Sequence, residues 1–152
     1  MKNLFNFDEY LVEAEVAKTA ARTSNDPVWK KLRDTLMTMV PKPRLLTFTS
    51  EGVPTQSLNW GSMAGPGKKW GFGVSSYRDN LSLIFSDESG LRRDGMKMVE
   101  FFRERGYPID ESLLKITQPR NGSIDSVISF DPKNPEKLKV DLTELVKTFP
   151  LS

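Results

Sequence analysis

Two short stretches with a two-residue alternation constrain the fold of this chain more than any other feature of its sequence. They are residues 45–49 (LLTFT) and residues 114–118 (LKITQ). In both, apolar side chains alternate with hydroxyl or charged ones, which is typical of a half-buried β-strand. We therefore predict one strand at 44–49 and another, far along the chain, at 113–118.

Each predicted strand carries an X-x-Thr pair on one face. The pair is Leu45 and Thr47 in the first strand, and Lys115 and Thr117 in the second. Hydroxyl groups donate hydrogen bonds and a lysine supplies a positive charge, so two such strands facing each other would hold an anion. Two alternatives stay open: threonine simply favours strands, and a register shift of one residue would exchange the two faces.

The other elements follow from periodicity, capping residues and turn residues. Asp26 followed by Pro27 marks the start of a second helix, and Gly106 marks the end of a third. Residues 50–69 contain a turn and a glycine-rich loop but no clear element. We predict helices at 6–22, from 26 to before 41–43 and at 88–105, and a short helix or extension at 142–149. The predicted strands are 70–75, 81–85, 124–130 and 138–140, the turns are 50–52 and 77–80, and the loops are 64–69 and 131–135.

The order of these elements predicts an α+β fold rather than a doubly wound sheet. At 152 residues, we expect a single domain over 1–152. Within it, 6–40 would be a pair of N-terminal helices, and 44–149 would be a body of sheet and helix. An apolar fraction of 38% with 28% charged residues is typical of a soluble globular protein.

Composition also limits the chemistry. The chain has no cysteine, which removes thiol chemistry, and no histidine, which removes the usual neutral-pH base and a common metal ligand. We expect no metal and no cofactor. A net charge of +2 is too small to indicate duplex nucleic-acid binding. No apolar run approaches the ~20 residues of a membrane span, and no secretory signal is visible, so we expect a cytoplasmic protein without membrane contact.

Taken together, the pattern resembles the two-histidine (2H) phosphoesterases. The shared features are an X-x-Thr strand, a hairpin, a helix ending in Arg-Gly-Tyr-Pro at 105–108, and a second X-x-Thr strand. The resemblance implies a two-lobed antiparallel sheet with the N-terminal helices packed on it. It also implies a groove in which two histidines act as acid and base while threonine hydroxyls hold phosphate oxygens; the matching threonines here are Thr47 and Thr117.

The compact phage branch of that family is the most similar in length and motif spacing. Its members degrade the cyclic oligonucleotide signals of bacterial CBASS defence. The opening NFDEYLVEA, at residues 6–14, also resembles the start of many T4-like phage proteins. The resemblance therefore implies a bacteriophage protein of immune evasion that acts in the host cytoplasm on a cyclic di- or trinucleotide.

Both histidine positions of the family are replaced in this chain. Leu45 cannot transfer a proton. At Lys115 a lysine replaces the histidine, and the reference pKa of a lysine side chain, ~10.4, is far from neutral pH. Because general acid–base catalysis contributes about 10²–10⁴-fold per group, turnover should fall by orders of magnitude while binding survives. We therefore favour a non-catalytic cyclic-nucleotide binder, with hydrolysis left open.

Five residues are candidates for ligand binding. Lys115 and Arg44 would pair with phosphate, Tyr10 and Trp70 would stack on bases, and Glu144 would accept from a base edge. The alternatives are solvated charges for Lys115 and Arg44, core packing for Tyr10 and Trp70, and a solvated helix residue for Glu144.

Two other classes of function stay open. Leu11-Val12-Glu13 before Ala14 resembles the processing site of T4-like prohead proteins, which would make this a capsid-internal protein with a processed N-terminal segment. A small inhibitor of a host enzyme, acting through the exposed edge of the sheet, is the other alternative. Ligand base identity and oligomeric state are open at this point.

Overall fold

The computed structural model describes residues 22–62, 66, 67, 69–116 and 122–151. Its elements are, in chain order, α2 (Pro27–Leu36), β1 (Arg44–Ser50), β2 (Val53–Trp60), β3 (Trp70–Ser75), β4 (Arg78–Phe85), α3 (Glu88–Gly90), the π-helical turn η1 (Leu91–Gly95), α4 (Met96–Glu104), α5 (Glu111–Ile116), β5 (Ser123–Ser129) and α6 (Pro135–Thr148).

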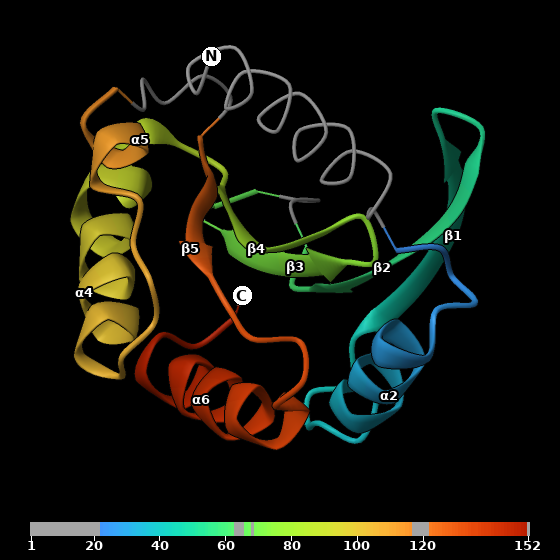
Figure 1. Cartoon of the computed structure of the whole chain (residues 1–152). Coiled ribbons are helices and arrows are strands. Elements are labelled where there is room, and N and C mark those ends of the chain that lie inside the picture. The colour runs from blue at the N-terminus through green and yellow to red at the C-terminus, as the bar shows by residue number, and fades with distance from the viewer. Residues whose placement is uncertain (1–21, 63–65, 68, 117–121, 152) are drawn as a thin grey trace, which may run out of the picture.

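The strands form one open antiparallel sheet in the order β1-β2-β3-β4-β5. In Figure 1, α2 and α6 lie along one side of this sheet, and α4 lies beside the edge that β5 forms. The predicted α+β class is therefore confirmed, whereas the two-lobed type and the single-domain boundary stay predictions. The predicted helix at 6–22 lies, apart from its last residue, outside the described residues.

Helix α2 begins at the predicted capping pair. The Asp26 carboxylate accepts a hydrogen bond from the backbone N of Trp29 at 3.2 Å, and Pro27 occupies the first turn, where no intrahelical N–H is needed. The indole N–H of Trp29 donates to Gln56 Oε1 on β2 at 3.1 Å, which ties the helix to the sheet. The buried residues of α2, spaced for one helical face, are Trp29, Leu32 and Leu36.

The first predicted strand is confirmed as β1, and a tight hairpin follows it. Glu51 and Gly52 both have positive φ, 50° and 79°, which suits a two-residue turn of type I′. The pairing starts with Ser50 opposite Val53 and continues along the whole of β1. Strand β2 has no counterpart among the predicted elements, because half of its side chains are polar and its sequence shows no clean alternation.

Strand β3 has the predicted bounds, but the turn after it lies earlier than predicted. The turn is formed by Ser76 and Tyr77, and β4 begins at Arg78. Buried Ser76 donates its N–H to Gln56 O at 2.8 Å, and its hydroxyl accepts from Gln56 N at 3.0 Å. This pair of bonds to the neighbouring strand places the turn, and a local sequence pattern cannot anticipate it.

The predicted helix at 88–105 is present as a run of helical residues whose winding changes in the middle. It comprises α3, η1 and α4, and Gly106 ends it with a φ of 84°. A Cβ on Gly95, at the end of η1, would lie 3.0 Å from Ile124 Cδ1 and 3.4 Å from Phe85 Cζ. Because Gly95 lacks that atom, the helical run lies close against β4 and β5.

The prediction of a second X-x-Thr strand at 113–118 is wrong. Its first residues form helix α5, so Lys115 projects from a helix. Asp110 caps this helix: its carboxylate accepts from Ser112 Oγ at 2.6 Å and from Leu113 N at 3.1 Å. These hydrogen bonds hold the Asp110 pKa below its ordinary value. A capping aspartate favours a helix over a strand, and a short apolar run cannot distinguish the two. Thr117 lies outside the described residues.

The strand predicted at 138–140 is also wrong, because these residues belong to α6. The Asn134 side chain accepts from Lys137 N at 3.4 Å, and Pro135 occupies the first turn. This is an ordinary helix start, within the segment predicted to be a loop. The predicted terminal helix is thus confirmed but begins earlier. The side chains that α6 buries at helical spacing are Leu138, Leu142 and Leu145.

The core lies between the helices and one face of the sheet. One row of cross-strand neighbours on this face is apolar and buried in every strand from β2 to β5: Trp60, Phe72, Leu83 and Ile124. The adjacent row, which points to the opposite face, is small or polar: Asn59, Gly73, Ser82 and Asp125. The sheet is therefore one-sided, as antiparallel sheets often are.

The correction at α6 leads to a test with a matched pair of variants. We expect Leu138→Ala to lower the free energy of unfolding by about 2–5 kcal/mol, because Leu138 is buried. Val140→Ala should change it by about 0.5 kcal/mol or less, because Val140 is 60% exposed. Urea unfolding followed by circular dichroism measures both. In a strand these residues would share one face, so similar losses in the two variants would contradict the helix.

Candidate functional site

The first predicted X-x-Thr pair lies on an exposed strand. Leu45, Thr47 and Arg44 are all exposed on β1. Thr47 Oγ1 accepts a hydrogen bond from Gln56 Nε2 at 3.3 Å, and Arg44 Nη2 donates to Gly61 O at 3.0 Å. No helix or strand of the described residues faces this pair with a second X-x-Thr pair, because Lys115 lies on α5. Within the described residues, the second strand of the predicted groove is therefore absent.

The remaining predicted residues are dispersed. Tyr10 and Thr117 lie outside the described residues. Glu144 is exposed on α6 and forms an ion pair with Lys147, Nζ to Oε1 3.7 Å, as expected of a solvated helix residue. Trp70 lies on β3, is 7% exposed, and lines a cavity.

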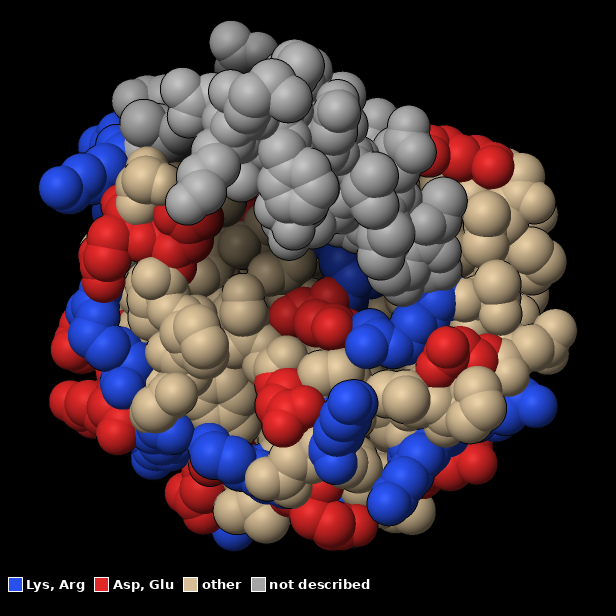
Figure 2. Space-filling model, viewed as in Figure 1, with Lys and Arg blue, Asp and Glu red and all other residues tan. Residues whose placement is uncertain are grey.

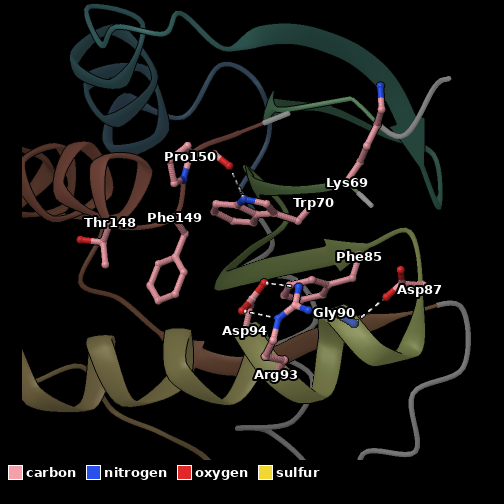
Figure 3. Close-up of a pocket in the computed structure, with 10 residues that line it drawn as sticks. All are labelled: Lys69, Trp70, Phe85, Asp87, Gly90, Arg93, Asp94, Thr148, Phe149 and Pro150. Atoms are coloured by element: carbon pink, nitrogen blue, oxygen red, sulfur yellow. Dashed lines mark hydrogen bonds and ion pairs between the residues drawn. The ribbon is translucent and has the colours of Figure 1, made fainter. Parts of the chain in front are cut away.

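That cavity has a volume of about 220 Å³ and is formed by three segments that are distant in the sequence. They are the chain at the start of β3, the segment from the end of β4 through η1, and the end of α6 with the residues that follow it. Figure 3 shows their side chains converging around it. The lining residues are Lys69, Trp70, Phe85, Asp87, Gly90, Arg93, Asp94, Thr148, Phe149 and Pro150.

An aromatic wall bounds one side of the cavity. The rings of Trp70 and Phe85 lie nearly parallel, with centroids 6.3 Å apart and an interplanar angle of 22°. The indole N–H of Trp70 donates to Pro150 O at 3.2 Å, which holds the C-terminal segment over the sheet. Phe149 therefore reaches the cavity from the opposite side, as Figure 3 shows. The wall is suited to a planar apolar group.

The π-helical turn η1 supplies the charged side of the cavity. A π-turn inserts a residue into a helix and is frequent at functional sites. Here it turns Arg93 and Asp94 toward the cavity, while Leu91 and Gly95 are buried beneath it. Just before it, the Asp87 carboxylate accepts from Ser89 Oγ at 3.0 Å and from the backbone N of Gly90, so it caps the start of the helical run.

Arg93 and Asp94 form a two-bond pair at the cavity. Arg93 donates through Nε to Asp94 Oδ1 and through Nη2 to Oδ2, both at 3.1 Å. The hydrogen bonds and the charge of Asp94 raise the pKa of Arg93 above its ordinary value, so the guanidinium stays charged. These bonds use two of its five N–H donors and leave three for a ligand. In Figure 3 the Lys69 ammonium points away from Arg93, so of the two cations drawn at the cavity Arg93 is the one beside the aromatic wall.

Most of this cavity was not predicted. The sequence offers Trp70 as a stacking candidate, but it predicts Arg93 and Asp94 as parts of a helix and Phe149 as part of a terminal helix or extension. The sequence carries no signal for the π-turn, at whose end Gly95 lies close to β4 and β5. It also cannot show that the segment after α6 returns to β3.

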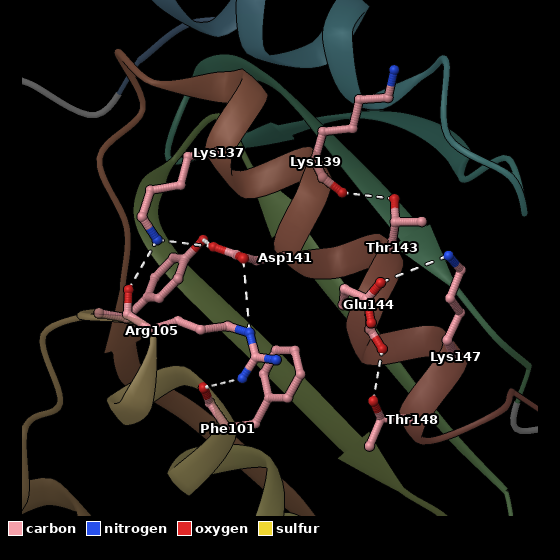
Figure 4. Close-up of polar contacts among 10 residues, drawn as sticks. Phe101, Arg105, Lys137, Lys139, Asp141, Thr143, Glu144, Lys147 and Thr148 are labelled. Atoms are coloured by element: carbon pink, nitrogen blue, oxygen red, sulfur yellow. Dashed lines mark hydrogen bonds and ion pairs between the residues drawn. The ribbon is translucent and has the colours of Figure 1, made fainter.

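A polar network fixes α6, whose C-terminal end leads into the cavity wall, against the end of α4. The Asp141 carboxylate, 13% exposed, accepts from Tyr107 Oη at 2.6 Å and from Lys137 Nζ at 2.9 Å. Arg105 Nε lies 3.8 Å from the same carboxylate, and its guanidinium lies 3.5 Å from the centroid of the Phe101 ring. Figure 4 shows Asp141 between Lys137 and Arg105.

No protein-family model matches the sequence, and neither a curated protein nor a solved structure matches it. Within the described ranges, no helix combines the length and apolar character needed to cross a membrane. The same part of the chain holds no group of three or more His, Cys, Asp or Glu side chains placed to bind a metal ion.

The Tyr107–Asp141 contact predicts a loss of stability at alkaline pH. Burial is the larger cause and the hydrogen bond to Asp141 the next one of a rise in the Tyr107 pKa above its ordinary value of 10.0. The folded state therefore keeps a proton that the unfolded state loses above that pH, and the free energy of unfolding should fall as pH rises from there. Tyr107→Phe should reduce this slope, and it should cost about 1.5–3 kcal/mol at neutral pH through the lost bond to a charged group.

Urea unfolding at a series of pH values measures both effects. Tyr77→Phe, on the turn between β3 and β4, is the matched control and should keep the wild-type slope. Equal slopes in wild type and Tyr107→Phe would show that Tyr107 does not cause the fall in the free energy of unfolding at alkaline pH.

Proposed function

We propose that this chain is a binding protein that holds a nucleotide-class ligand, with one planar base in the cavity beside Trp70. The observation that carries this proposal is the meeting of an aromatic wall with the Arg93 guanidinium in one cavity. Aromatic contact with a base contributes about 1–3 kcal/mol per base at other single-strand and nucleotide sites. A guanidinium with donors to spare supplies hydrogen bonds to a phosphate.

The size of the cavity limits how much of a ligand enters. Its volume of about 220 Å³ is below the roughly 300–1,000 Å³ of pockets that enclose whole drug-sized ligands. One ring system would therefore sit inside, with sugar and phosphate at the mouth near Arg93. The mixed charge of the surface in Figure 2, where acidic and basic side chains are interspersed, favours a small anion over an extended polyanion.

The resemblance to the 2H phosphoesterases makes a cyclic di- or trinucleotide the first ligand to test. In that case the chain would be a phage anti-defence protein that sequesters a CBASS signal in the host cytoplasm. The complete absence of histidine favours binding without hydrolysis, because the acid and base of that family have no counterpart at Leu45 and Lys115. The proposed site differs from the predicted one: it lies at Trp70 and Arg93 instead of between two X-x-Thr strands.

The test is calorimetric titration of the protein with cyclic dinucleotides that carry adenine or guanine. We expect Arg93→Gln to weaken binding by about 10-fold or more, because a hydrogen bond to a charged group contributes about 1.5–3 kcal/mol. Trp70→Phe, which keeps an aromatic wall but removes the bond to Pro150, should also weaken it. Arg92→Gln, on the same π-turn but outside the cavity lining, is the matched control and should bind as wild type does.

Two outcomes separate the parts of this hypothesis. Absence of both heat and thermal shift with every cyclic dinucleotide and trinucleotide tested would contradict it. Equal weakening by Arg93→Gln and Arg92→Gln would contradict the location. Chromatography of the ligand after incubation decides between binder and enzyme, because a binder returns the ligand intact.

A further inference from the structure

The two edges of the sheet differ in how they are protected. Edge β5 is covered by the chain that precedes α5: Ser129 N donates to Pro108 O at 3.0 Å, Asp110 N donates to Val127 O at 2.8 Å, and a bridge joins Ile109 to Ile128. Edge β1 pairs only with β2 among the strands of the described residues. Open edges invite pairing with another chain.

Strand β1 lacks the features that usually prevent such pairing. Natural edge strands carry charges, prolines or bulges, or are very short. From 45 to 50, β1 has no charge and no proline, and its register with β2 runs without a bulge. Three of its large apolar side chains are exposed to solvent, Leu45 by 40%, Leu46 by 50% and Phe48 by 42%. In Figure 2 the surface over the β1–β2 hairpin is mostly uncharged.

The backbone of β1 has donors and acceptors directed outward. In a two-residue hairpin, the residues that flank the turn form a hydrogen-bonded pair, here Ser50 and Val53. Every second residue before Ser50 therefore bonds to β2. The N–H and C=O groups of Leu45, Thr47 and Thr49 point the other way, away from the sheet.

We propose that β1 is a homodimer interface in which two copies pair antiparallel about a two-fold axis at Thr47. The outward groups of Thr47 then meet those of Thr47 in the second copy, and Leu45 pairs with Thr49. Between them, Leu46 comes opposite Phe48, so an exposed apolar side chain covers another in both halves of the interface. The two five-stranded sheets become one continuous sheet.

Charge complementarity favours a second copy in this orientation. Arg44 lies at one end of β1, and Glu51 lies in the turn just beyond the other end. Antiparallel pairing about Thr47 places Arg44 opposite Ser50 and next to Glu51 of the other copy, twice by symmetry. Parallel pairing would place like charges together. A symmetric dimer thus uses the same patch on both subunits, as two-fold interfaces require.

The absence of cysteine from the chain allows a position-specific test. Thr47→Cys introduces a single thiol that would face its own copy across the axis, at the Cα separation of about 5.5 Å of a hydrogen-bonded pair, which suits a disulfide. We expect mild oxidation to convert this variant to a covalent dimer. Thr49→Cys, whose thiol would face Leu45, is the matched control and should form the covalent dimer at least about tenfold more slowly.

Analytical sedimentation of the full chain over a range of concentrations tests the interface without a covalent cross-link. We expect a monomer–dimer equilibrium. The Phe48→Lys substitution should raise the concentration at its midpoint by about tenfold or more, because a charge would replace an apolar contact. Val140→Lys, an exposed apolar position on α6, should leave the midpoint unchanged. Circular dichroism of each variant confirms that it is folded.

Three results would overturn dimerisation through β1 in the register about Thr47. The first is a monomer at every concentration, which would leave the edge to residues 1–21 or to a different protein, as the host-inhibitor alternative requires. The second is faster cross-linking at position 49 than at 47, which would exclude the register about Thr47. The third is an equal shift by Phe48→Lys and Val140→Lys. None of these results depends on ligand binding at Trp70, which lies on β3.

Discussion

A row of aromatic rings on one face of the sheet connects its strands to the rest of the fold. Trp60 and Phe72 stack with centroids 4.6 Å apart, Trp70 lies 5.5 Å from Phe72, and Phe85 lies 6.3 Å from Trp70. Such pairs contribute about 0.5–1.5 kcal/mol each beyond the area they bury. The two indole N–H groups reach backbone carbonyls outside the sheet, at Pro41 and Pro150, both at 3.2 Å. One apolar row therefore positions both the chain before β1 and the chain after α6.

The cavity is a consequence of that arrangement. The hydrogen bond from Trp70 to Pro150 holds the segment after α6 over β3. Because Gly95 has no side chain, the π-turn can lie close to β4 in the same region. Arg93 and Asp94 lie where these two segments approach each other. The cavity is therefore formed by packing between distant segments, and its charged pair is placed by an irregular turn in a helix instead of by a local motif.

The sheet also shows how an open edge and a closed one can coexist. The edge at β5 is closed by backbone bonds from the residues before α5, whereas β1 extends beyond the helices and is exposed along most of its length. The buried apolar row that begins at Trp60 on β2 does not continue onto β1, and the large apolar side chains of β1 are exposed instead of lying in the core. Their exposure is thus separate from folding, and it is accounted for more simply by association with another chain.

The sequence by itself determined the elements whose signals are local. Asp26 and Pro27 start α2, alternation gives β1, and Gly106 ends the third helix, so the α+β class was predictable. Only the tertiary structure decided the rest. Strand β2 forms because β1 and β3 complete its backbone bonds, and the π-turn η1 brings Gly95 close to Ile124 and Phe85. The helix near Lys115, by contrast, begins at a local cap, Asp110. A short segment satisfies more than one period, and partners far away in the chain select which of them forms.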